Sequence, residues 1–160
     1  MNFKESFGKG LDAAAKAQEL TNEIDSIFEE LDQQIQEASD GKISIFRKST
    51  YESLDSTASV GLGTIGAATA AATLAASGLL NRKKVTGIFA NRPGSKKDSI
   101  QLGTFKIHKK GYPCEIQFGD DRLICEDKKS LEKALNYLLS DVEIGKSLAK
   151  IMNRIEETDL

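Results

Sequence analysis

The stretch at 104–125, which reads TFKIHKKGYPCEIQFGDDRLIC, contains two glycine-bearing turns between runs of alternating apolar and polar residues. Alternation with a period of two is typical of strands that bury one face, and glycine is typical of tight hairpin turns. We expect the two turns at residues 110–111 and 119–120. The stretch therefore predicts three consecutive antiparallel strands over 99–109, 112–118 and 121–126.

The two turns predict registers that agree with each other. The first turn pairs Ile107 with Cys114, and the second pairs Cys114 with Cys125. Polar residues then share the opposite face, where Lys106 lies across from Glu115 as a favourable cross-strand pair. Both registers place the same residues on one apolar face: Phe105, Ile107, Cys114, Ile116, Phe118, Leu123 and Cys125.

The residues on either side extend this unit. Upstream, residues 85–90 form a fourth strand candidate, followed by a turn signal at 91–95. Ile100 and Leu102 are out of phase with Phe105, so we expect a bulge near Gly103.

Downstream, the apolar face of the sheet needs a cover. Leu131, Leu135 and Leu138 form an apolar stripe on a helix that begins near residue 128. Residues 140–143 have the pattern of a capping box before a second helix, whose apolar positions continue to Ile155. The sequence predicts a four-stranded antiparallel meander covered by C-terminal helices.

The N-terminal part predicts a long acidic helix over residues 9–39, ended by Asp40-Gly41. Its apolar residues alternate at spacings of three and four, close to a heptad pattern that is broken at Gln34: Ala17, Leu20, Ile24, Ile27, Leu31 and Ala38. One interpretation is a coiled-coil or partner-binding helix with its interface at Leu20, Ile24, Ile27 and Leu31. The other is a helix that packs on its own domain.

Residues 42–46 predict a short strand, and residues 49–59 a polar connector. The uncharged Gly/Ala segment at 56–81 contains a G-x-G-x-x-G match at Gly61, Gly63 and Gly66. No buried strand precedes it and no acidic residue follows about 20 positions on, so it lacks the context of a dinucleotide site. The segment resembles glycine-zipper segments, and it predicts either a membrane-associated segment or a small-residue helix that forms a helical hairpin with the first helix.

Charge is distributed unevenly along the chain. Residues 1–59 carry 6 basic and 12 acidic side chains, whereas residues 82–129 carry 12 basic and 6 acidic ones. We therefore expect an α+β protein with a helical region at 1–81 and a basic sheet region with helices at 82–160.

The sequence predicts no catalytic site, no cofactor and no metal site. Two Cys and one His are too few for a disulfide scaffold or a Cys/His zinc cluster, and we expect Cys114 and Cys125 to be core thiols. His108 lies beside two lysines near a turn and has no predicted triad partners. The candidate partner-binding residues are the basic ones in the loops and turns: Arg92, Lys96, Lys97, Lys106, His108, Lys109 and Lys110.

These features predict a non-enzymatic interaction protein, such as a small inhibitor, an immunity-type protein or a scaffold, that binds another protein or itself. It would act through the N-terminal helix or the basic turns. Two alternatives stay open: a membrane-associated protein whose Gly/Ala segment docks on lipid, and a nucleic-acid-binding module that uses the basic loops. No small-molecule substrate is evident. The absence of a signal-like segment in the first 20 residues and the low Cys count predict a cytoplasmic location.

Overall fold

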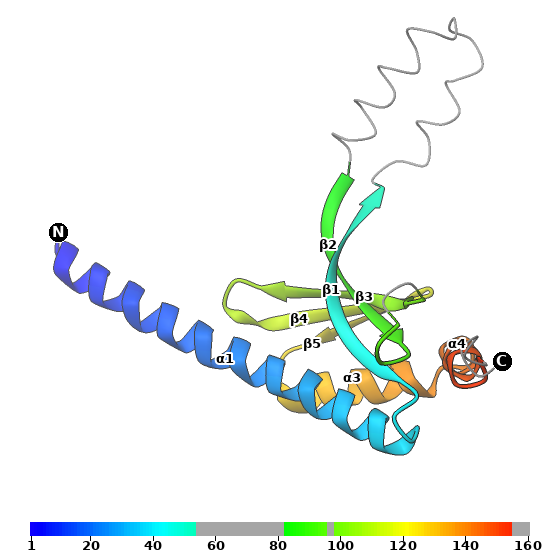
Figure 1. The fold of residues 1–160 in the computed structure, drawn as a ribbon. Coiled ribbons are helices and arrows are strands. Elements are labelled where there is room, and N and C mark those ends of the chain that lie inside the picture. Colours follow the sequence, from blue (N-terminus) through cyan, green and yellow to red (C-terminus); the bar gives the residue numbers. More distant parts are fainter. Residues whose placement is uncertain (54–81, 96–97, 155–160) are drawn as a thin grey trace, which may run out of the picture. The chain divides into compact units, whose positions relative to one another are not determined.

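The computed structural model describes residues 1–53, 82–95 and 98–154. These residues form a long helix α1 (Phe3–Ala38), a five-stranded antiparallel sheet, and two further helices, α3 (Lys128–Ser140) and α4 (Val142–Met152) (Figure 1). The strands are β1 (Ser44–Ser53), β2 (Arg82–Asn91), β3 (Ile100–His108), β4 (Gly111–Phe118) and β5 (Asp121–Cys125). The predicted α+β class is confirmed.

The sheet has one strand more than we predicted, and its strand order is β1-β2-β3-β4-β5. The additional strand is β1, which covers the predicted short strand and part of the predicted connector. Its second half, Lys48–Ser53, is polar and has no alternating apolar residues. That composition is why the pattern of hydrophobicity did not mark it as a strand.

The chain divides into two compact units, one containing Met1–Lys48 and the residues from Gly87 onward, the other containing Ser49–Thr86. The first unit holds α1, most of the sheet, and both C-terminal helices. The division at residue 81 that charge and composition predicted stays a prediction. The described part of the second unit consists of the adjoining ends of β1 and β2.

The strand register predicted from the two turns is confirmed. Ile107 lies opposite Cys114 in the β3–β4 pair, Lys106 lies opposite Glu115, and Cys114 lies opposite Cys125 in the β4–β5 pair. Glu115 also accepts two hydrogen bonds from the Arg122 guanidinium, at 2.6 and 3.0 Å. These bonds lower the pKa of Glu115.

The first turn is shifted by one residue from the prediction. His108 pairs with Gly111, so Lys109 and Lys110 occupy the turn, and the register shifts between Ile107 and His108. Gly111 has a φ of +97°, a conformation that favours glycine. The shift explains how the turn moves while the pairs beyond it keep the predicted register.

The predicted apolar face of the sheet is buried, with one correction. Phe105, Cys114 and Ile116 are at most 4% exposed, but Ile107 is 39% exposed because it adjoins the register shift at the end of β3. Leu102 and Phe105 are both buried although they are three residues apart. The bulge expected near Gly103 stays a prediction.

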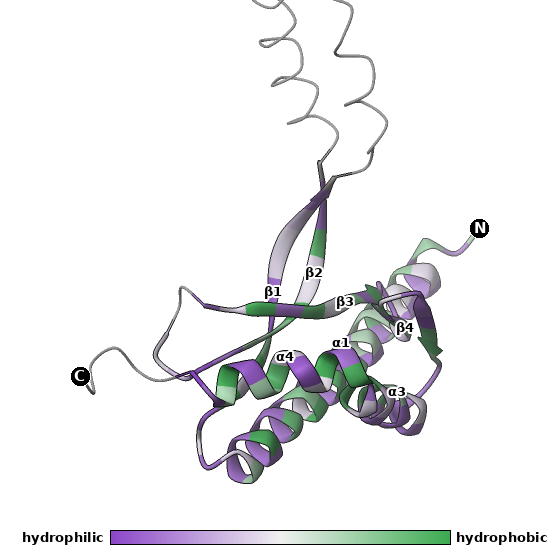
Figure 2. Cartoon of the chain, turned by 90° about the vertical axis from the view of Figure 1, so that its right-hand side faces the viewer, coloured by the Kyte–Doolittle hydropathy of each residue, from purple (hydrophilic) through white to green (hydrophobic). Residues whose placement is uncertain are grey.

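Helices α1, α3 and α4 lie on the same side of strands β3–β5 (Figures 1 and 2) and cover that face. Their buried side chains complete the core with those of the strands: Ile24, Ile27, Phe28, Leu131, Ala134, Leu135, Leu138, Ile144 and Ile151.

The helix starts differ in detail from the prediction. The capping box belongs to α3, where the Asp127 carboxylate accepts from the Ser130 N–H at 2.8 Å and the Ser130 hydroxyl bonds the Asp127 N–H. Helix α4 is instead capped by Asp141, which accepts from two backbone N–H groups. Ser140 is not the cap because it is still the last residue of α3.

Helix α1 begins at Phe3 and not near residue 9 as predicted. Asn2 caps it by accepting from the Glu5 N–H at 3.3 Å. Gly8 and Gly10, which suggested a boundary, both lie inside the helix. The predicted end is confirmed: the helix stops at Ala38, before Asp40 and Gly41 at φ +53° and +75°.

Several predictions fall on residues outside the described ranges. They are the Gly/Ala segment at 56–81 with its helical hairpin and its glycine motif, Lys96 and Lys97, and Ile155.

Candidate interaction surface on the N-terminal helix

The second half of α1, from Leu20 to Ala38, is built into the core of the first unit. Phe28 packs edge-on against Phe105 of β3, with ring centroids 5.1 Å apart. The Arg47 guanidinium lies over the Phe28 ring at 4.2 Å from its centroid. This cation–π contact covers the aromatic pair from the side of β1.

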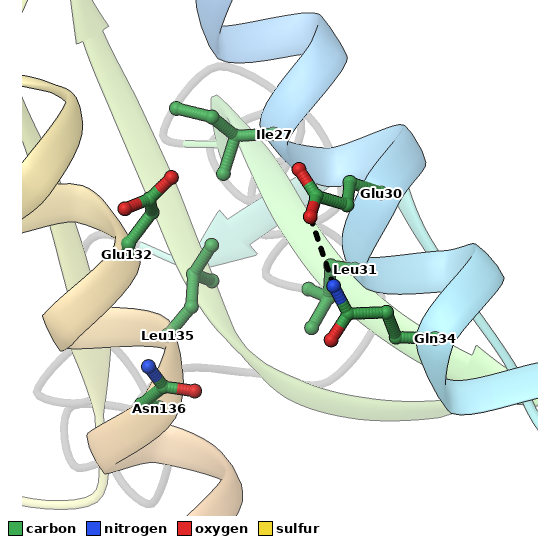
Figure 3. A pocket seen from close by; sticks show the side chains of 7 residues that line it. All are labelled: Ile27, Glu30, Leu31, Gln34, Glu132, Leu135 and Asn136. Atoms are coloured by element: carbon green, nitrogen blue, oxygen red, sulfur yellow. Dashed lines mark hydrogen bonds between the residues drawn. The ribbon is translucent and has the colours of Figure 1, made fainter. Parts of the chain in front are cut away.

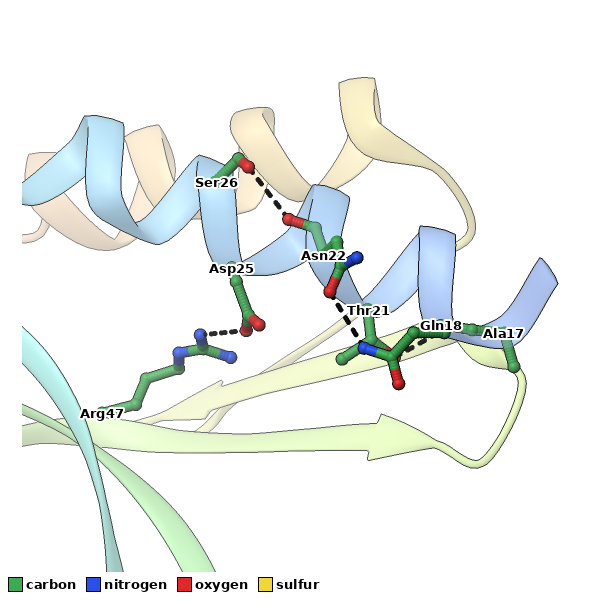
Figure 4. A network of polar contacts seen from close by, with 7 residues as sticks. All are labelled: Ala17, Gln18, Thr21, Asn22, Asp25, Ser26 and Arg47. Atoms are coloured by element: carbon green, nitrogen blue, oxygen red, sulfur yellow. Dashed lines mark hydrogen bonds and ion pairs between the residues drawn. The ribbon is translucent and has the colours of Figure 1, made fainter. Parts of the chain in front are cut away.

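Polar contacts fix the same half of α1 to β1. The Arg47 guanidinium pairs with the Asp25 carboxylate at 2.7 Å (Figure 4). Two turns further on, Asp32 accepts from the Ser44 hydroxyl and from the Ile45 N–H, both at 2.9 Å. The second half of the helix is therefore held by packing and by directed bonds together.

The contacts of α1 with the sheet begin at the β3–β4 turn. Gly111 lies so close to α1 that a Cβ there would be 2.6 Å from the Cβ of Leu20. Next to it, the Tyr112 hydroxyl donates to the Glu23 carboxylate at 2.9 Å. Burial and this carboxylate raise the pKa of Tyr112.

The first half of α1 projects beyond this junction (Figure 1). From Phe3 to Lys16, every residue except Gly8 is exposed. The large apolar side chains are no exception, since Phe3 is 74% exposed, Phe7 68% and Leu11 56%. A long apolar stripe in water is unfavourable, and such a surface indicates a binding site.

Within the described part of the chain, the polar side-chain contacts of this half are local to α1 and its cap. Lys9 pairs with Glu5 at 2.9 Å, and the Gln18 amide donates to Asn22 at 2.9 Å (Figure 4). Contacts between residues four apart support a helix but connect it to nothing else. We call residues 3–17 the arm.

One heptad stripe runs through both halves of α1. Its residues alternate at spacings of four and three: Phe3, Phe7, Gly10, Ala14, Ala17, Thr21, Ile24, Phe28, Leu31 and Ile35. Residues Ile24 to Ile35 of the stripe pack on the core, whereas Phe3 to Ala14 do not. The helix was predicted to begin near residue 9, so the first part of the arm was not predicted. The signal that marks it is the spacing of Phe3, Phe7 and Leu11, four residues apart.

The predicted interface residues of α1 lie mainly inside the chain. Ile24 is 0% exposed and Ile27 6%, and Leu31 packs against the core. Leu20 is half-buried against Gly111. In this fold Ile24 and Ile27 are unavailable to a partner, and the interpretation of α1 as a helix packed on its own domain holds for its second half.

The predicted basic residues are placed at both ends of β3. Lys106, His108, Lys109 and Lys110 are exposed around the β3–β4 turn. Arg92 follows β2 at the other end of β3, and its guanidinium donates to the Arg154 carbonyl at 2.6 Å. These residues therefore do not form one continuous surface.

A hollow of about 260 Å³ lies between α1 and α3 (Figure 3). Its apolar wall belongs to Ile27, Leu31 and Leu135, and its polar residues are Glu30, Gln34, Glu132 and Asn136. The Gln34 amide donates to Glu30 at 2.9 Å, which satisfies one of the two carboxylates. The hollow is the gap left between the side chains of two packed helices, α1 and α3.

The two thiols lie in the core. Cys114 and Cys125 are each 1% exposed and directly opposite one another. The hydrogen bond with Cys125, together with burial, raises the pKa of the Cys114 thiol and keeps it protonated. In the described ranges no three His, Cys, Asp or Glu residues gather as metal ligands would.

No family model, curated protein or solved structure matches this chain. Among the helices of the described residues, none has the length and hydrophobicity needed to cross a membrane.

Proposed function

We propose that the protein is a non-enzymatic interaction protein that binds another protein chain through the arm. The observation that supports this most strongly is the exposure of Phe3, Phe7 and Leu11 on one side of a projecting helix. These residues belong to or flank the same stripe that forms core contacts further along α1. An apolar stripe presented by a helix at this spacing fits a groove or another helix.

The energetics of the arm favour the same conclusion. A helix of about 15 residues is marginal in water without packing, because few contacts offset the loss of backbone entropy. Gly8 and Gly10 each weaken it by about 1 kcal/mol relative to Ala. A partner that covers Phe3 and Phe7 would stabilise the helix and remove the exposed apolar surface at once.

Site-specific photo-cross-linking in the organism that expresses the chain tests this proposal. Benzoylphenylalanine placed at Phe7 is expected to give protein adducts, because this position lies on the apolar side of the arm. The same probe at Lys9 is the matched control. Lys9 is two residues away on the charged side, where we expect few or no adducts.

Adducts of equal yield from both positions, or none from either, would contradict the proposal. The identity of the adduct is read by mass spectrometry, so an adduct of two copies of this chain and an adduct with a different protein are distinguished in the same experiment.

A further inference from the structure

We infer that the partner of the arm is a second copy of this chain, bound antiparallel to it. This inference rests on the proposed function of the arm and names its occupant. It starts from the order of side-chain sizes along the stripe, where Phe3 and Phe7 come first and Gly10, Ala14 and Ala17 follow.

An antiparallel copy brings large residues against small ones. If the two-fold axis passes between Gly8 and Lys9, Phe7 lies opposite Gly10 and Phe3 opposite Ala14 of the other copy. The symmetry repeats both contacts, so each aromatic ring fills the space over a glycine or an alanine. These layers alternate as the seam of an antiparallel coiled coil requires.

A parallel copy has no such complementarity. It would place Phe7 against Phe7 and Ala14 against Ala14, so the helices would be forced apart at one end and leave a gap at the other. Close packing requires large and small side chains to alternate across the contact. The stripe is therefore complementary to a second copy of itself only when the two helices run antiparallel.

The charges of the arm are compatible with this contact. At about 100° per residue, Glu5, Lys9, Asp12 and Lys16 fall on the side of the helix opposite the stripe. They stay in water when the stripe is covered, and no like charges meet across the seam.

The same charges favour a protein over a lipid surface. Helices that lie on anionic membranes carry an excess of Lys and Arg on their polar side. Here three lysines, Lys4, Lys9 and Lys16, stand against two acids, Glu5 and Asp12, and Lys9 is already paired with Glu5. The side chains of the arm therefore carry a net charge of only +1, which offers little attraction to anionic lipid.

The size of the contact sets the expected affinity. Two Phe side chains and Leu11, at 56 to 74% exposure, would bury roughly 400 Å² per copy. The total of about 800 Å² is below the roughly 1,000 Å² of a stable specific interface, so the contact is a weak one. We therefore expect a reversible dimer with a dissociation constant in the micromolar range.

Sedimentation equilibrium of the purified full chain, from low to several hundred micromolar, measures this dimer. The average mass is expected to rise from 17.4 kDa toward twice that value. Phe7→Gln is expected to remain a monomer over the whole range. Lys9→Gln, which introduces the same residue on the opposite side of the arm, is expected to dimerise like the wild type. Thermal unfolding of each variant verifies that it is folded.

A cross-linking experiment tests the direction. Ser6 and Ala13 flank the stripe, and an antiparallel pair brings Ser6 of one copy near Ala13 of the other. A mixture of Ser6→Cys and Ala13→Cys chains, treated with a short bis-maleimide, is expected to give the mixed dimer in excess over either homodimer. The native thiols are buried and do not compete.

A constant mass of 17.4 kDa at every concentration, or equal dimerisation by Phe7→Gln, would overturn the inference. A monomer that floats with vesicles of phosphatidylcholine and phosphatidylglycerol, in a manner lost in Phe7→Gln, would overturn it in favour of lipid. If the chain is a monomer but Phe7 cross-links to a different protein, the inference fails and the proposed function stands.

Discussion

The two halves of α1 share one heptad stripe but differ in what covers it. From Leu20 onward the stripe is buried by the sheet and α3, and Asp25 and Asp32 bond to β1. From Phe3 to Lys16 the side chains are exposed, and the polar contacts stay within the helix and its cap. The same pattern of residues thus stabilises the fold in one half and presents a binding surface in the other.

This difference shows that a periodic stripe predicts a contact but not the chain that makes it. Along α1, the sheet reaches as far as the β3–β4 turn, where Gly111 lies close to Leu20. Beyond that point the described core no longer covers the stripe. The predictions that follow test this division, from the largest expected effect to the smallest.

Truncating an aliphatic side chain should destabilise the fold strongly in one half of α1 and hardly at all in the other. Ile24→Ala removes a fully buried side chain and is expected to lower the free energy of unfolding by about 2–5 kcal/mol. Leu11→Ala removes one that is 56% exposed and is expected to change it by less than about 0.5 kcal/mol. Urea denaturation at low protein concentration measures both. Equal losses would show that the arm is part of the core.

Gly111→Ala tests the contact between the β3–β4 turn and α1. The new Cβ would lie 2.6 Å from the Leu20 Cβ, and the backbone is at φ +97°, so we expect a loss of about 1–3 kcal/mol. Gly94→Ala is the control, because Gly94 has a φ of +89° and no atom within 4 Å of the added Cβ. If both variants lose the same stability, the loss comes from the backbone conformation alone, and the contact between the new Cβ and Leu20 contributes nothing.

Substitutions at Arg47 and Asp25 test the contacts between α1 and β1. Arg47→Lys keeps a positive charge near Asp25 but loses the planar stacking on Phe28, for an expected loss of about 1 kcal/mol. Asp25→Asn keeps the stacking and removes the ion pair, which should matter less because Asp25 is half exposed. Thermal unfolding compares the two. A larger effect of Asp25→Asn would mean that the ion pair dominates over the stacking.

We expect Tyr112 to make a pH-dependent contribution to the stability of the fold. Its raised pKa means that the folded chain holds the phenol proton more tightly than the unfolded chain does. The stability that results is fully present below about pH 10, the ordinary value, and is lost as the pH rises further. Wild type should therefore lose stability faster than Tyr112→Phe between pH 9 and pH 11 in urea denaturation. Parallel pH profiles would show that burial and the Glu23 carboxylate do not raise the pKa of Tyr112 in the folded chain.

Much of the first unit could be predicted from the sequence because its signals are local. The registers of β3, β4 and β5 follow from two short turns, and Cys114, Ile116 and Cys125 were placed on the buried face. The start of β1 overlaps the short strand predicted at 42–46, but its extension to Ser53 could not be predicted, because a polar half-strand at the edge of a sheet needs no apolar alternation. The exposure of Ile107 could not be predicted either, since it depends on where the register shifts.

The candidate site was only partly visible in the sequence. The stripe indicated a contact helix, but the residues assigned to its interface, such as Ile24, are the ones that the chain buries itself. The exposed residues Phe3 and Phe7 lie before the predicted start of the helix near residue 9. Propensity argues against a helix there, and Asn2 as a cap together with continuity with the packed half outweighs it.

Hydrogen exchange of the full chain at low and high protein concentration tests the central claim most directly. The amides of residues 3–17 should exchange fast at about 1 μM and become protected at several hundred micromolar, because a second copy then covers the arm. The amides of residues 20–38 should be equally protected at both. Protection of residues 3–17 that is the same at both concentrations would contradict the account.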